Sequence, residues 1–190
     1  MNTDTLSKSQ IQEQLDTAFS TTINWIDRYP ENELNKIIME GKWTAAGHVY
    51  HLIKSTKAVS VGIRKPKLIL RWTFGLNNRN EKSYEQLKNK YNKALESPKV
   101  QAPEGYSASP ERQFNKSELI ARFNHELDQL KKAMIKWNEK QLTKYIVPHP
   151  ALGKMTIREV LYFTIFHTKH HLNILEEKYK LKKEISCKQD

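Results

Sequence analysis

The sequence predicts an all-α fold, a four-helix bundle with an insertion after its second helix. Four long segments carry apolar residues at helical spacing. The 190 residues include only six glycines and seven prolines, which suits long helices with few breaks. The composition, 38% hydrophobic and 28% charged, fits helices that each bury a single stripe. We expect one helical-bundle domain over residues 1–180, followed by a charged tail over 181–190.

The first predicted helix covers residues 7–28 and ends before Pro30. Its apolar stripe consists of Ile11, Leu15, Ala18, Phe19, Thr22 and Ile26. The second begins after Trp43, with Thr44 as its N-cap and Pro66 as its outer limit. Its stripe consists of Ala45, Val49, Leu52, Thr56, Val59 and Ile63.

The segment after the second helix lacks a clear period. Residues 64–80 mix basic, aromatic and turn residues, so we expect an insertion with one short helical turn. Residues 82–95 predict a weaker helix around Tyr84, Leu87, Tyr91 and Leu95. Three prolines and a glycine then predict a loop over 97–114.

Two N-terminal signals predict the remaining helices. Asn115 and Glu118 have the spacing of a capping box, and Thr156 and Glu159 repeat it. The helix after the first box has a stripe of Leu119, Phe123, Leu127, Leu130, Met134 and Trp137. The helix after the second continues to about Tyr179, and the prolines and glycine of 145–154 predict a turn between the two.

Histidines on two of these helices form a candidate metal site. His167 and His171 are four residues apart, so both imidazoles project from one helix face. Two buried histidines need partners for their nitrogens, and a cation offers one, although this spacing is also found in unrelated histidine pairs. His51 lies on a strip with small residues, Gly47, Ser55, Ala58 and Gly62, which leaves room for a ligand. Three imidazoles with open positions suit zinc or nickel better than iron, which usually has a carboxylate ligand.

The residues Trp43 to Leu52, Thr156 to Leu161 and His167 to His171 resemble the DinB-like superfamily of bacterial four-helix proteins. The superfamily includes metal-dependent transferases that act with bacillithiol or mycothiol. The resemblance implies that His51, His167 and His171 are metal ligands, and it implies a homodimer. Gly47 departs from the family pattern, because an acidic residue is usual there, and 64–80 is a second departure.

Other polar residues have a simpler interpretation. We expect His48 and His170 to be exposed on helix flanks, and His149 between two prolines to have a structural role in its loop. His48 lining the pocket and His149 acting as an acid or base are the alternatives. Glu159 is assigned to helix capping. Surface solvation and attraction of an anionic substrate explain Arg158, Lys169 and Lys42 equally well.

The sequence restricts the possible functions less than it restricts the fold. Because Cys187 is the only cysteine, the chain can form neither an intrachain disulfide nor a cysteine-based zinc site. No segment resembles a signal peptide or a membrane span, which predicts a cytoplasmic protein. The charge of +11 is spread over all helices without a recognition motif, so nucleic acid is not an expected partner.

The leading hypothesis is a divalent-metal enzyme that acts on a small, anionic substrate by thiol transfer or hydrolysis, with a low-molecular-weight thiol as a second cofactor. The alternative is a non-catalytic binding or stress-response bundle that contacts a protein, a lipid surface or nucleic acid.

Overall fold

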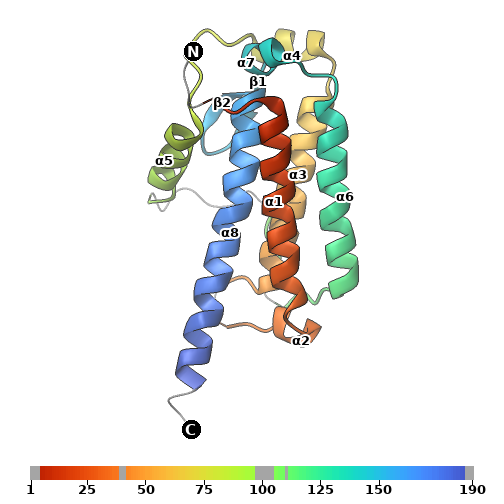
Figure 1. Ribbon diagram of the computed structural model, residues 1–190, viewed down its shortest axis with the longest axis vertical. Helices are drawn as coiled ribbons and strands as arrows, with labels where there is room; N and C mark the ends of the chain where they lie inside the picture. Colours follow the sequence, from red (N-terminus) through yellow and green to blue (C-terminus); the bar gives the residue numbers. More distant parts are fainter. Residues whose placement is uncertain (1–4, 39–41, 97–104, 110, 187–190) are drawn as a thin grey trace.

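The computed structural model describes residues 5–38, 42–96, 105–109 and 111–186, with side chains up to residue 180. Of the described helices, four have 19 residues or more, and Figure 1 shows that they run along the molecule. They are α1 (Lys8–Asp27), α3 (Ala45–Arg64), α6 (Lys116–Met134) and α8 (Ile157–Ser186). α1 packs against α6 and α8, and α3 packs against the same two helices. The predicted four-helix bundle is confirmed, with α1 and α3 on one of its diagonals.

Side-chain caps explain where the long helices begin. Ser7 and Gln10 form a capping box at α1, and the Thr44 hydroxyl accepts from the Gly47 amide at α3. Asn115 accepts from the Glu118 amide at α6. Each cap satisfies an amide that has no carbonyl partner within the first helical turn.

The core lies between the four helices and contains the predicted stripes. A stacked pair of rings, Phe19 and Phe123, joins α1 to α6 with centroids 4.2 Å apart. Val59 is the one stripe residue of α3 that is only partly buried. Within the described part of the chain, no helix is long and apolar enough to cross a membrane.

Shorter elements cover the ends and one side of the bundle. α2 (Glu31–Leu34) closes one end, while α4 (Lys67–Phe74), α7 (Glu139–Lys144) and a β-hairpin lie at the other (Figure 1). α5 (Tyr84–Leu95) packs on α8 beside the bundle. The predicted weak helix over 82–95 is therefore confirmed.

The hairpin corrects the expectation of a simple turn. β1 (Ile146–His149) pairs antiparallel with β2 (Gly153–Thr156), so that His149 is opposite Gly153. Gly153 has a φ of 76°, the left-handed conformation that closes a three-residue hairpin loop. The predicted turn exists, but two short strands flank it.

Three further boundaries differ from the prediction. The insertion contains eight helical residues in α4 rather than one turn. α6 ends at Met134, and Trp137 lies buried beyond it, where its indole donates to the Ile63 carbonyl. α8 continues past Tyr179 to Ser186, and Cys187 lies outside the described residues.

Candidate metal centre

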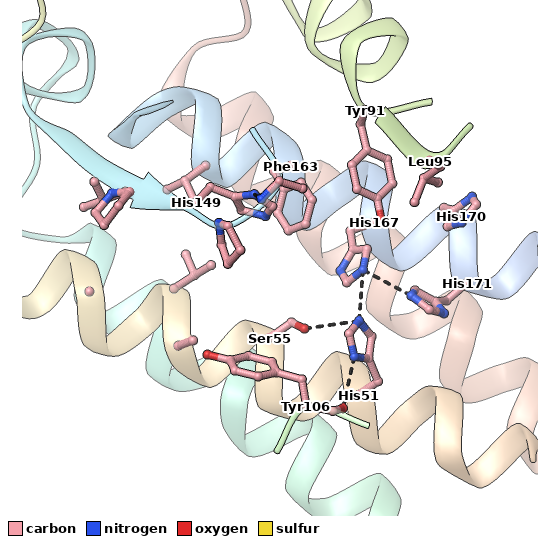
Figure 2. A pocket seen from close by; sticks show the side chains of 18 of the residues that line it. His51, Ser55, Tyr91, Leu95, Tyr106, His149, Phe163, His167, His170 and His171 are labelled. Carbon is pink, nitrogen blue, oxygen red and sulfur yellow. Dashed lines mark hydrogen bonds between the residues drawn. The ribbon is translucent and has the colours of Figure 1, made fainter. Parts of the chain in front are cut away.

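Three histidine side chains from two helices meet at one point. His51 extends from α3, and His167 and His171 extend from α8 (Figure 2). His167 Nε2 lies 3.2 Å from His51 Nε2 and 3.1 Å from His171 Nε2. Bonds of 2.1 Å to one ion place nitrogen ligands about 3.0 Å apart in octahedral and about 3.4 Å apart in tetrahedral geometry. Both distances to His167 Nε2 are those of neighbouring ligands on one metal ion, and the three ligand atoms lie within 4.8 Å of one another.

The ring of His51 is oriented by the backbone of a distant segment. Its Nδ1–H donates to the carbonyl oxygen of Tyr106, 3.1 Å away (Figure 2). With the hydrogen on Nδ1, the lone pair of Nε2 is directed into the triangle. The Ser55 hydroxyl lies 3.5 Å from the same Nε2, one helical turn further along α3.

The ring of His171 is held by a second histidine. His171 Nδ1 lies 2.8 Å from His48 Nδ1, and Lys178 Nζ lies 3.2 Å from His48 Nε2. An ammonium group only donates, so a charged Lys178 places the His48 hydrogen on Nδ1, which then donates to His171. Coordination through His171 Nε2 requires the opposite direction, with His171 Nδ1 donating to His48.

Burial keeps the triangle uncharged. The side chains of His167 and His171 are almost completely enclosed, and this desolvation holds the pKa of each well below its usual value. Burial also lowers the pKa of His51, although the hydrogen bond to Tyr106 opposes the shift. All three rings are therefore neutral at pH 7, the form in which imidazole binds a metal.

Aromatic side chains surround the three rings. Phe163 stacks on His167 with centroids 4.7 Å apart, and Trp43 packs against His51 at 4.9 Å. Tyr91 of α5 approaches His167 edge-on at 6.0 Å. These contacts restrict ring rotation and keep the three Nε2 atoms convergent.

The triangle opens into a cavity of about 410 Å³, within the range of small-molecule sites. One wall is the small-residue strip of α3, with Ser55, Ala58 and Gly62. The opposite wall comes from α5, α8 and the hairpin. No aspartate or glutamate lines this cavity among the described residues, and Lys65 lies at its edge.

Several flanking residues differ from the expectation. His48 is buried, not exposed, because α8 packs against α3 and places His171 and Lys178 on its ring. His170 is half-buried and lines the cavity. Arg158 is 4% exposed and forms ion pairs with Glu81 and Glu139 rather than lying at the surface.

Two residues have more than one contact. Glu159 caps α8, as predicted, since its carboxylate accepts from the Thr156 amide. The buried carboxylate also forms an ion pair, at 2.5 Å, with the exposed Arg79 of the insertion. His149 has a structural role in the hairpin loop, as expected, and it also lines the cavity.

The acceptor for His51 is a main-chain carbonyl, which no side-chain pattern in the sequence could have indicated.

Comparisons with known proteins agree with this architecture. The family model of the DinB superfamily matches residues 14–175. A similar solved structure is YfiT from Bacillus subtilis, described as a probable metal-dependent hydrolase with an unusual four-helix bundle topology. The two chains are 16% identical with a TM-score of 0.58, over 96% of this chain and 93% of YfiT, which indicates a shared fold. No curated protein matches the sequence.

Proposed function

We propose, because this chain belongs to the DinB superfamily, that it is a metal-dependent enzyme with His51, His167 and His171 as ligands of one divalent ion. The convergence of their three Nε2 atoms beside a cavity is the observation that carries the proposal. Three neutral imidazoles on one side of an ion suit zinc or nickel and leave positions open toward the cavity.

The chemistry proposed for the site is hydrolysis of a small molecule. A divalent ion held there would supply a Lewis acid that makes water a stronger nucleophile at neutral pH. The described residues contribute orientation and an apolar environment: Tyr106 and His48 hold two of the rings in place, and Trp43 and Phe163 pack against His51 and His167. The description of YfiT as a probable metal-dependent hydrolase supports this choice of reaction.

A second reaction, thiol transfer, is favoured by the absence of carboxylates from the described cavity wall. Hydrolysis usually also uses a general base, whereas a thiol can lose its proton on coordination alone. Assays with ester and amide substrates, and with thiol panels plus an electrophile, separate the two reactions. Metal-loaded protein that is inactive in both assays would favour the non-catalytic alternative.

Metal binding itself is tested by titrating metal-free protein with zinc and with nickel in a calorimeter. We expect one ion per chain in the wild type and a large loss of affinity in H51A and in H167A. His125 is exposed on α6, so H125A is the matched control and should bind as the wild type does. Stoichiometric binding that survives in both H51A and H167A would reject the proposed ligands.

A further inference from the structure

His149, the last residue of β1, is bonded to the hairpin backbone through one ring nitrogen, and its side chain also lines the cavity. His149 Nδ1 accepts from the backbone amides of Ala151 and Leu152, each at 3.2 Å. Because two N–H groups point at Nδ1, the hydrogen of the neutral ring must be on Nε2. Burial, reinforced by nearby Lys90, lowers the pKa of His149 to about 4, so the ring stays neutral at pH 7.

The Nε2–H of His149 is an available donor. Among the described residues it forms no hydrogen bond, although the side chain lines the cavity. The ring lies next to the candidate metal centre: Phe163 separates it from His167, with centroid distances of 4.3 Å and 4.7 Å (Figure 2). A ligand beside the three histidines is thus one aromatic ring away from this donor.

The shape and charge of the cavity restrict the ligand further. From His51 to Gly62 the strip of α3 extends for three helical turns, about 16 Å. The wall is mostly apolar, lacks carboxylates among the described residues, and has Lys65 at its edge. An elongated apolar molecule fits this space, and a cationic group would find no counter-charge.

We propose that the Nε2–H of His149 recognises a carbonyl or carboxylate oxygen of an elongated, mainly apolar substrate that lies along α3. This inference rests on the proposed function only in that the substrate occupies the cavity beside the three histidines. His149 is then a binding residue for the substrate, and its structural hydrogen bonds fix the donor before the ligand arrives.

Two substitutions separate the structural role from the binding role. In H149N the side-chain oxygen can replace Nδ1 as acceptor for the Ala151 amide, as in an Asx turn, but the donor toward the cavity is lost. In H149Q the longer amide can place an N–H near the position of Nε2. A merely structural histidine predicts that H149N binds ligand better than H149Q, whereas our inference predicts the reverse.

The probes are octanoate and octylammonium, which share an alkyl chain and differ in the charged group. We expect octanoate, but not octylammonium, to bind and to shift the Nε2–H resonance of His149 in protein labelled with ¹⁵N-histidine. H149N should weaken octanoate binding at least about tenfold, and H149Q clearly less. In the wild-type protein without ligand, the ring nitrogen resonances of His149 should also show that the hydrogen is on Nε2.

Three results would overturn the inference: no octanoate binding, an unshifted His149 resonance with octanoate bound, or equal affinity in H149N and the wild type. The measurements are made on zinc-loaded and on metal-free protein. If zinc fails to bind at His51, His167 and His171 while octanoate still shifts His149, the proposed function fails and this inference stands.

Discussion

His48 is the side chain that positions a candidate ligand without belonging to the triangle. Its Nδ1 contacts Nδ1 of His171, whereas Nε2 of His171 contacts His167. Partners of this kind hold ligand rings in place and often account for a tenfold to hundredfold difference in metal affinity. Its burial follows from the packing of α8 against α3, because Lys178 covers it.

We predict that H48A weakens zinc binding about 10–100-fold, because His171 loses its orienting contact. Competition against a chelator of known affinity measures the change, and circular dichroism confirms that the helices persist. An unchanged zinc affinity in H48A would show that His171 is held by its ring contacts alone.

Whereas His48 is expected to raise the zinc affinity, Lys178 is expected to lower it. Its charge repels a cation, and its donation to His48 favours the His171 hydrogen on the nitrogen that would bind the metal. We predict that K178M raises zinc affinity at least about threefold. K180M, an exposed position on the same helix, is the control and should leave the affinity unchanged. A K178M variant that binds zinc more weakly than the wild type contradicts this assignment.

For single residues, the sequence predicted which histidines meet, but not which neighbouring groups orient their rings. The i,i+4 spacing of His167 and His171 fixed their common face, and the small neighbours of His51 indicated an open strip. Whether His48 is covered depends on how α8 packs against α3, and no local pattern contains that information. The acceptor for His51 belongs to a segment 55 residues away in the chain.

At the scale of elements, the start of α8 is tied to the insertion. The fully buried Glu159 carboxylate accepts from the amides of Thr156 and Lys82, each at 2.9 Å, and pairs with Arg79. One side chain thus caps the helix that carries two candidate ligands and anchors the segment that follows α4. The favourable contacts outweigh the desolvation of the carboxylate, so the pKa of Glu159 is lowered.

We predict that E159A lowers the free energy of unfolding by about 2–3 kcal/mol, because it removes the cap of α8 and leaves the amides of Thr156 and Lys82 without their acceptor. E118A is the matched control: it occupies the same helical position at α6 but is exposed, and should cost no more than about 0.5 kcal/mol. Urea unfolding measures both, and similar midpoints for the two variants would contradict the proposed anchoring role.

The long helices were predictable because their stripes extend over many turns. The short elements were not. α2 has four residues and each hairpin strand has four, which is too few for a period to appear. Trp137 matched the stripe of α6 by spacing, yet the helix ends before it and the indole packs in the core through a loop. Tertiary contacts decided these boundaries, not local preference.

At the scale of the whole molecule, buried neutral histidines make stability depend on pH. Burial lowers the pKa of His48 to about 3 and that of His149 to about 4, and those of His167 and His171 are also depressed. Above pH 6.5 these histidines are neutral in both the folded and the unfolded chain. Below pH 6.5 the unfolded chain binds protons that the folded chain does not, so the free energy of unfolding falls.

We predict that metal-free protein becomes less stable as the pH is lowered from 7.5 to 5.0, with up to about 1.4 kcal/mol per pH unit for each buried histidine. Urea unfolding with a chelator present measures this, and the window avoids titration of most carboxylates. H48Q should reduce the slope, whereas H125A should not. A midpoint that is the same at both pH values would show that the histidines can be protonated without unfolding.

The prediction of the whole architecture succeeded because composition and the four long apolar stripes both indicated helices. Low glycine and proline content indicated long helices, and a single cysteine excluded a disulfide framework. The cavity was only partly predictable. The α3 strip indicated space, but the opposite wall combines α5, α8 and the hairpin, and their meeting depends on the complete topology.

The hydrogen bond from His51 to Tyr106 has a consequence for the evolution of this scaffold. The acceptor is a main-chain carbonyl, present whatever amino acid occupies position 106, while the Tyr106 side chain lines the cavity. A mutation there can remodel the cavity wall and still leave His51 correctly oriented. The arrangement of the three histidines can therefore stay the same in related proteins while the residue at position 106 changes the cavity beside it.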